Sequence, residues 1–178
     1  FAGGADSEAG LKPAGERLLR NMNRLPVAVD LAHMNEKSFY DALNVLSYGP
    51  IVSHTCCYDL NPHQRNLKEN QMKELRMAKG MMGITFVDQF LSENPADASI
   101  DMIIDHILYA SDYMGIDRVA LGSDFDGADM PYDLPNQKSL PQLYRRMRER
   151  DFSDTEINMV AGENLFRFMI DTLSREET

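Results

Sequence analysis

The sequence predicts an α/β fold in which parallel strands alternate with helices, and three observations carry this prediction. Short apolar runs recur along the chain. Each is followed by a longer segment whose apolar residues recur at three- and four-residue spacing, as on one face of a helix. Three of the four runs lead directly into a histidine or an aspartate. Such alternation is typical of a parallel sheet with crossover helices packed on it.

The first part of the chain contains two expected strands and two expected helices. We expect a helix at 13–25, a strand at 27–31, a helix from Asn35 to Gly49, and a strand at 51–53. Pro26 ends the first helix, because proline lacks an amide hydrogen and clashes with the preceding turn. Asn35 is a good N-cap for the second helix, since its side chain can accept a hydrogen bond from the first turn.

The second part repeats the pattern and then becomes helical. We expect a helix at 67–79 capped by Gly80, a strand at 81–87, a helix from Ser99 or Asp97 to Gly115, and a strand at 119–121. Helices follow at 140–150 and at 163–174, and Ser153 with Glu156 forms a capping box between them.

Four strand–helix units leave the closure of the sheet open. A closed parallel barrel takes eight strands and typically about 250 residues, whereas this chain has 178 residues. On the strand count alone, a small open sheet of the flavodoxin type fits equally well. We expect residues 1–178 to form a single domain, because this length is usual for one hydrophobic core.

Charge and cysteine content exclude several classes of partner. The formal net charge of −10 argues against nucleic acid and anionic membranes, since both would repel it. No apolar run approaches the roughly 18 residues of a transmembrane helix. The only cysteines, Cys56 and Cys57, are adjacent and permit no ordinary loop-closing disulfide. We therefore expect a reducing compartment, the cytoplasm.

The residues that follow the predicted strands are candidates for a metal site. His33, His54 and Asp124 come directly after three of them, and parallel folds place their active sites at the carboxyl ends of strands. Two imidazoles on neighbouring strands can turn toward one ion. Zinc suits them, because it binds neutral imidazole and carboxylate and leaves a position for water in catalytic sites.

Asp124 and Asp126 compete for the role of working carboxylate. They flank Phe125, so they point the same way if the strand continues and diverge if it ends at Ser123 or Gly127. We favour Asp124, since a carboxylate beside a metal-activated water can accept its proton or hold a substrate ammonium. Asp126 is expected to have a loop-capping role.

These segments together resemble the membrane (renal) dipeptidase family of zinc metallopeptidases, family M19 of the amidohydrolase superfamily. The resemblance rests on motifs that recur in the family's order. They are Asn21-Met-Asn-Arg-Leu25, Val29-Asp-Leu-Ala-His33, Pro50-Ile-Val-Ser-His54, His63-Gln-Arg-Asn66, Leu121-Gly-Ser-Asp-Phe-Asp-Gly127 and Gly162-Glu-Asn-Leu-Phe-Arg167.

The resemblance implies a fold, a cofactor and roles for four residues. The fold would be the C-terminal half of a (β/α)8 barrel of the metal-dependent hydrolase type. His33 and His54 match two histidines that, with a bridging glutamate, hold one zinc of a binuclear pair. Arg65 matches the arginine that binds the dipeptide's terminal carboxylate, as its guanidinium fork suits. Asp124 matches an aspartate beside the bridging water, and the implied reaction is dipeptide hydrolysis.

The chain departs from the family pattern in its metal ligands. The family's His-x-Asp pair and bridging glutamate precede the part matched here, and no His-x-Asp occurs. Two histidines leave zinc under-ligated, so we expect the isolated chain to bind metal weakly and to be inactive. A Cys56 or Cys57 thiolate could join the metal, although two packed thiols are the simpler expectation. His63 and His106 are expected to be a loop residue and a packed helix residue.

Three functional hypotheses remain open at this point. The chain is part of a dipeptidase, or a catalytically dead remnant that serves as a structural or interaction module, or a barrel enzyme acting on another amide or a lactam. Half a barrel exposes sheet edges and an apolar face. We therefore expect a homo-oligomer or pairing with the missing half, with a dipeptide as substrate.

Overall fold

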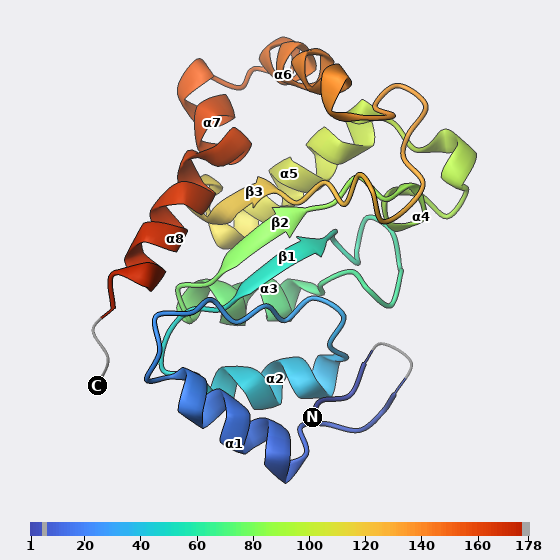
Figure 1. The fold of residues 1–178 in the computed structure, drawn as a ribbon. Helices are drawn as coiled ribbons and strands as arrows, with labels where there is room; N and C mark the ends of the chain where they lie inside the picture. The colour runs from blue at the N-terminus through green and yellow to red at the C-terminus, as the bar shows by residue number, and fades with distance from the viewer. Residues whose placement is uncertain (5–6, 176–178) are drawn as a thin grey trace.

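The computed structural model describes residues 1–4 and 7–175, and Figure 1 labels its elements. The helices are α1 (Pro13–Met22), α2 (Glu36–Val45), α3 (Glu69–Met77), α4 (Asp88–Leu91), α5 (Ile100–Met114), α6 (Leu140–Glu149), α7 (Asp154–Asn158) and α8 (Asn164–Leu173). The strands are β1 (Ile51–Thr55), β2 (Met81–Ile84) and β3 (Val119–Leu121). Short 3-10 turns lie at Pro95–Asp97, Ile116–Arg118 and Gln137–Ser139, and a π-helical turn at Met159–Glu163 joins α7 to α8.

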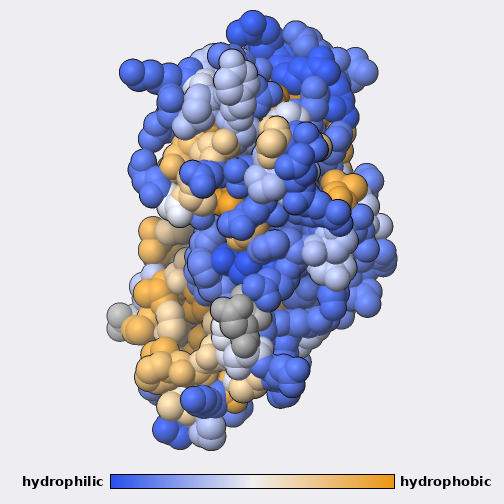
Figure 2. Space-filling view, turned by 90° about the vertical axis from the view of Figure 1, so that its right-hand side faces the viewer, coloured by the Kyte–Doolittle hydropathy of each residue, from blue (hydrophilic) through white to orange (hydrophobic). Residues whose placement is uncertain are grey.

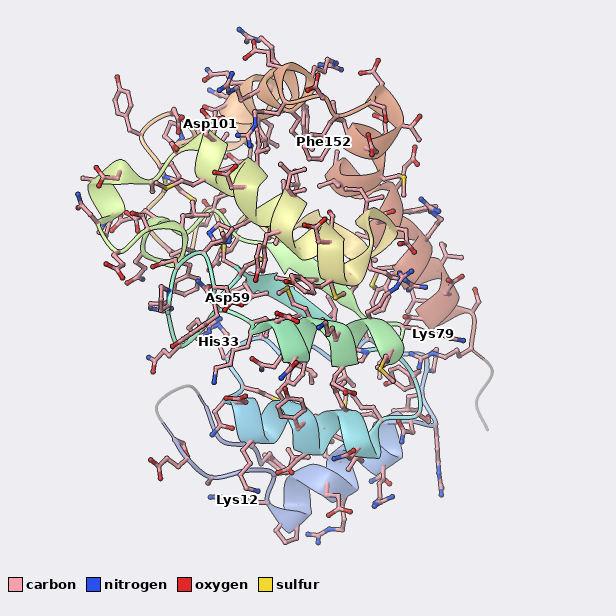
Figure 3. All side chains as sticks on the ribbon, turned by 180° about the vertical axis from the view of Figure 1, so that it is seen from behind. Lys12, His33, Asp59, Lys79, Asp101 and Phe152 are labelled. Atoms are coloured by element: carbon pink, nitrogen blue, oxygen red, sulfur yellow. The ribbon has the colours of Figure 1, made fainter. Side chains whose placement is uncertain are left out.

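The three strands form one parallel sheet in the order β1-β2-β3, which confirms the predicted α/β architecture. Helices α3 and α5 cover one face of this sheet: they lie behind it in Figure 1 and in front of it in Figure 3. Helix α8 lies toward the amino ends of the strands, whereas the loops that follow the strands gather at the opposite end. The carboxyl ends of the strands therefore meet in one layer of loops.

The strand expected at 27–31 is absent, so that prediction was wrong. With β1, the segment makes a single parallel bridge, between Asp30 and Ile51, and two backbone hydrogen bonds: Leu31 N–H to the Ile51 carbonyl and Ile51 N–H to the Val29 carbonyl. The Asp30 carboxylate accepts the amide hydrogens of Ala32 and Ser53. These amides bind a side chain instead of a ladder partner, and the extended segment ends after one bridge.

Strand β1 is longer than predicted and carries a bulge at its end. Val52 pairs with Met82 and Thr55 pairs with Ile84, so Ser53 and His54 together oppose the single residue Gly83. A bulge of this kind bends the strand and redirects a side chain, and such bulges are frequent at barrel rims and beside active sites.

Several predicted helix ends are confirmed. The side chains of Asn35, Ser99 and Ser153 each cap a helix, Glu156 completes the capping box, and Gly115 ends α5 with a positive φ.

Gly80 was wrongly predicted as the capping residue of α3. Lys79 takes the left-handed conformation, with a φ of 60°, and the Gly80 amide donates to the Leu75 carbonyl. Gly80 is needed for space instead, since a Cβ there would lie 2.7 Å from the Pro50 carbonyl oxygen.

The two faces of the sheet carry separate apolar clusters. Val52, Met82 and Val119 belong to the main core together with α5 residues such as Ile104. Met81 and Ala120 point the other way and pack on Phe168 of α8. Helix α8 also exposes three apolar side chains at helical spacing, namely Phe166, Ile170 and Leu173. Within the described residues, no helix is long and apolar enough to cross a membrane.

We predict that Gly83→Ala destabilises the fold, because the bulge brings the Ser53 carbonyl oxygen to 2.1 Å from a Cβ built at this position. Overpacking of this kind costs about 1–3 kcal/mol, which urea unfolding would measure. Gly162→Ala is the matched control, since a Cβ there meets nothing within 4 Å. Equal stability of the two variants would contradict the close approach at the bulge.

Candidate metal centre

His33 and His54 meet at the carboxyl ends of the strands. Their Nε2 atoms are 2.9 Å apart, and the ring centroids are 4.9 Å apart at an interplanar angle of 65°. His54 comes from the bulge in β1, and His33 from the turn that leads into α2. Figure 3 shows His33 at the same end of the molecule as Asp59, in the loop after β1, and opposite Lys79. The structure thus brings together the two histidines that were predicted as ligands.

Two of the predicted site residues have an unusual backbone conformation. His33 has a φ of 70° and Asp124 a φ of 62°, and within the described ranges only Lys79 and Asp151 among non-glycine residues also have positive φ. Non-glycine residues rarely adopt this conformation, and strained residues cluster at functional sites. The left-handed turns end the extended segments at these points and hold both side chains in the loop layer.

Arg65 lies directly beside the histidine pair. Its Nη1 is 2.8 Å from His33 Nδ1, and its guanidinium carbon lies 5.3 Å from the Phe90 ring centroid. Nη2 is buried without a hydrogen-bond partner. Burial lowers the pKa of Arg65, while the charges of Asp124 and Asp30 raise it. The second arm of the guanidinium fork is therefore an unsatisfied donor at the site.

The loop that carries Arg65 is held by its neighbour Asn66, whose side chain is buried. Its Oδ1 accepts from Cys56 N–H, and its Nδ2 donates to the carbonyls of Asn61 and Phe90. The Thr55 hydroxyl donates to the Arg65 carbonyl. These bonds tie the arginine loop to the end of β1, so the guanidinium is presented from a fixed backbone.

Asp124 lies in the loop after β3, and its charge acts on His33 and Arg65 of the site. Strand β3 ends at Leu121, so strand alternation does not decide where the side chains of Asp124 and Asp126 point. The charge of Asp124 raises the pKa of His33, against the larger lowering effects of burial, Arg65 and His54. Its carboxyl folds over Gly127, where a Cβ would lie 2.4 Å from Asp124 Oδ1, whereas Asp126 is exposed.

Asp30 and Ser53, for which no role was predicted, also belong to the site. The Ser53 hydroxyl lies 2.5 Å from Asp30 Oδ2 and 2.8 Å from His54 Nδ1. The only available signal was their place in two of the family motifs, directly before or close to a predicted ligand.

The cysteines are packed thiols, as the simpler expectation had it. Cys56 and Cys57 are free and fully buried. Burial raises the pKa of Cys56 well above its usual value, and burial with the charge of Asp59 raises that of Cys57. Each Sγ donates to a backbone carbonyl, that of Thr85 for Cys56 and that of His106 for Cys57, so both thiols are engaged within the core.

The two remaining histidines also have structural roles. His106 on α5 is 1% exposed, accepts from Cys57 N–H through Nδ1 and bonds the Leu91 carbonyl. His63 stacks on Phe90, and its Nδ1 accepts from Arg65 N–H. Each therefore supports the loops around the site from outside.

The histidine pair fits a zinc ion as two of its ligands. Imidazole nitrogens bound to one tetrahedral zinc at about 2.0–2.1 Å lie roughly 3.3–3.4 Å apart, so the observed 2.9 Å must open by only about half an ångström. In the part of the chain that the structure describes, no group of three or more His, Cys, Asp and Glu side chains could hold a metal. The pair alone is an incomplete site.

Cavities lie at both ends of the strands. One of about 380 Å³ borders Arg65 and is also lined by Met34, Tyr58 and Lys68. A larger one, about 520 Å³, is lined by Lys79 and other residues that precede the strands. We assign the site to the smaller cavity's end, because parallel folds build active sites at the carboxyl ends. Figure 2 looks onto this end and shows a hydrophilic centre beside a hydrophobic side.

Comparison with known families gives a match over nearly the whole chain. Residues 2–177 match the family described as membrane dipeptidase, peptidase family M19. The dipeptidase tcpJ of Claviceps purpurea (strain 20.1) is 34% identical over 176 residues, which is 95% of this chain and 41% of that protein. The chain is therefore less than half as long as this relative.

Two solved structures are similar in both fold and sequence. A metallo peptidase from Rhodobacter sphaeroides, liganded with a phosphinate mimic of the dipeptide L-Ala-D-Ala, has a TM-score of 0.90 and 32% identity. The dipeptidase AC, a metallo peptidase of family M19, has a TM-score of 0.91 and 31% identity. The match covers 97% and 98% of this chain but 50% and 53% of those chains.

We predict that His106 makes stability depend on pH. Burial lowers its pKa from the ordinary 6.5 to about 4. Below pH 6.5, His106 binds a proton in the unfolded chain but stays neutral in the folded chain. The stability that is present above pH 6.5 is therefore lost as the pH falls toward 4. The full loss is roughly 3 kcal/mol, measurable as the urea-unfolding free energy at pH 7 and at pH 4.5. His106→Gln, which cannot titrate, should show a flatter profile, and an unchanged slope would contradict the assignment.

Proposed function

The chain belongs to the membrane dipeptidase family, peptidase family M19, and on that premise we propose that it is the C-terminal half of a zinc-dependent dipeptidase. The observation that carries the proposal is the approach of His33 and His54 Nε2 to 2.9 Å beside the Arg65 guanidinium. Residues 1–178 form one part of a longer catalytic unit in this proposal.

The proposed fold of the complete unit is a (β/α)8 barrel. Three parallel strands with helices on one face, and an extended segment at 27–31 beside β1, provide about half of the eight strands that a barrel needs. The solved relatives are about twice as long as the matched region. Both facts support a barrel that is completed by a segment outside this chain.

The proposed metal is a zinc pair, and His33 and His54 would hold one of its ions. A His-x-Asp pair and a bridging glutamate from the preceding half would supply the other ligands. When bound, zinc makes hydroxide available near neutral pH and polarises an amide carbonyl. The similar Rhodobacter sphaeroides protein is described as a metallo peptidase, which supports a metal-dependent reaction for this chain.

Arg65 is proposed to bind the terminal carboxylate of a dipeptide. Its buried Nη2 lacks a partner in the structure, and a carboxylate oxygen would satisfy that donor through a charge-assisted hydrogen bond. A fixed cation at this point selects short peptides with a free C-terminus. The dipeptide mimic bound by the similar metallo peptidase supports this substrate class.

Asp124 is proposed to act as the catalytic carboxylate. Its charge acts on both His33 and Arg65, so it lies near these two residues. From there it can accept the proton of the attacking water and pass that proton to the departing amine. Alternatively, it can hold the substrate's ammonium.

A catalytically dead remnant is the second candidate. It is favoured by one observation, namely that the described residues offer two histidines and no larger cluster of metal ligands. In that case the domain would serve a structural or interaction role.

The proposed partner is the missing half or a second copy of this chain. Half a barrel leaves both edges of its sheet unpaired, and the exposed Phe166, Ile170 and Leu173 of α8 add apolar surface. The proposed compartment is the cytoplasm, which the free, buried thiols of Cys56 and Cys57 support.

We predict that the 178-residue chain self-associates at micromolar concentration when it is produced alone. Light scattering would detect dimers or larger species, and Ile170→Glu should shift them toward monomers. Leu108→Glu on the outer face of α5, also an exposed apolar residue, is the matched control and should not. A compact monomer at every concentration would count against half a barrel.

We predict that the isolated chain retains almost no zinc and hydrolyses no dipeptide, because two ligands hold zinc weakly. Co-production with the segment that precedes Phe1 in its gene should restore zinc, measured by mass spectrometry, and dipeptidase activity. C-terminally amidated dipeptides are the control substrates and should not be cleaved.

The enzyme proposal has a clear point of failure. If the gene encodes no preceding segment with a His-x-Asp pair and a later glutamate, the dipeptidase assignment is wrong. The catalytically dead remnant is then the better description of this chain.

A further inference from the structure

The hydrogen bonds around the histidine pair have only one consistent direction, and Asp30 sets it from one end. Its carboxylate accepts from the amides of Ala32 and Ser53 and from the Ser53 hydroxyl. An ionised carboxylate is an acceptor only. The Ser53 hydroxyl has a single hydrogen, which is committed to Asp30, so its oxygen can only accept from His54 Nδ1, 2.8 Å away.

Arg65 requires the same direction of hydrogen-bond donation at the other end of the network. A guanidinium only donates, so His33 Nδ1 must accept from Nη1 at 2.8 Å. A neutral His33 then carries its hydrogen on Nε2 and donates it across the 2.9 Å contact to His54 Nε2. That nitrogen must be bare, and the His54 hydrogen must again be on Nδ1. Two independent ends of the network give one answer.

We propose that Asp30 and Ser53 are positioning residues that fix His54 in the Nδ1–H tautomer and so present its Nε2 lone pair as a preformed metal-binding atom. The complete chain of donors runs from Arg65 through His33, His54 and Ser53 to Asp30. The metal-binding part of this inference rests on the proposed function, whereas the tautomer part rests on hydrogen-bond geometry alone. Partners that bond the remote nitrogen of a ligand histidine are known to fix its tautomer and orientation.

The same chain gives His33 the opposite tautomer. Its Nε2 carries the hydrogen as long as Arg65 donates to Nδ1, so His33 can bind a metal through Nε2 only after Arg65 has moved away. In the metal-free chain the two histidines therefore carry their hydrogens on different ring nitrogens.

The test reads the tautomers directly in the metal-free chain. The protein contains four histidines, so ¹⁵N-histidine labelling gives a simple long-range proton–nitrogen spectrum, recorded at pH 8 where unperturbed imidazoles are neutral. We expect His54 to be protonated at Nδ1 and His33 at Nε2. A wild-type His54 protonated at Nε2 overturns the proposal without any variant.

Asp30→Asn reverses the Asp30 end of the chain and is the decisive variant. The new side chain keeps an oxygen for the two backbone amides but turns an NH2 donor toward the Ser53 hydroxyl. Ser53 must then donate to His54 Nδ1, which moves the His54 hydrogen to Nε2 and breaks the 2.9 Å contact with His33, whose Nε2 also carries a hydrogen. Asp112→Asn, an exposed position on α5, removes the same charge and should leave both tautomers unchanged. A folded Asp30→Asn protein with an unaltered His54 overturns the proposal.

Ser53 variants and zinc provide the second readout. Ser53→Thr keeps the hydroxyl and should keep the His54 tautomer, whereas Ser53→Ala removes the acceptor of the Nδ1 hydrogen and should leave a mixture of both His54 tautomers. Zinc titration of the chain co-produced with the preceding segment, followed on the His54 signals, should show affinity about 10–100-fold weaker for Asp30→Asn and Ser53→Ala than for wild type and Ser53→Thr. If wild-type tautomers are as expected but zinc perturbs neither His33 nor His54 in this complete unit, the proposed dipeptidase site fails and the tautomer assignment is supported.

Discussion

Two backbone hydrogen bonds between the segment at 27–31 and β1 are the constraint on which the site depends. Leu31 N–H and Ile51 N–H are bonded across this contact, and it fixes where the extended segment ends. Two residues later the backbone turns left-handed at His33, while on the other side β1 bulges at Ser53 and His54. The two imidazoles meet because both departures from regular strand geometry occur at the same level of the sheet.

Much of the fold could be predicted from the sequence, because caps and apolar periodicity are local signals. Asn35, Ser99 and Ser153 cap the helices that they were predicted to cap. The strand at 27–31 could not be excluded in this way, because the Ser53 N–H of β1, which would continue the pairing, is bonded to the Asp30 side chain 23 residues away. The positive φ at Lys79 was not predicted, because glycine adopts positive φ more readily than lysine and Gly80 is the next residue. Gly80 is instead required for close packing.

In the candidate site, too, local signals predicted the residues but not the contacts between them. The residue types of His33, His54, Arg65 and Asp124 were readable from their places after apolar runs and in family motifs. Their mutual contacts were not, because a register irregularity and two left-handed residues decide them. The pairing of Ser53 with Asp30 was invisible for the same reason, since nothing in the order of residues shows that a bulge brings a hydroxyl onto a carboxylate.

The left-handed backbone at His33 and Asp124 limits what simple side-chain truncation can reveal about either residue. Alanine at these positions would lose the functional group and would also be forced into a conformation that costs roughly 1–2 kcal/mol, so a loop shift and a lost contact would be measured together. Asparagine tolerates this region better than most residues. An amide replacement at residue 124 would therefore separate the chemistry of a carboxylate from the geometry of its turn, which truncation cannot do.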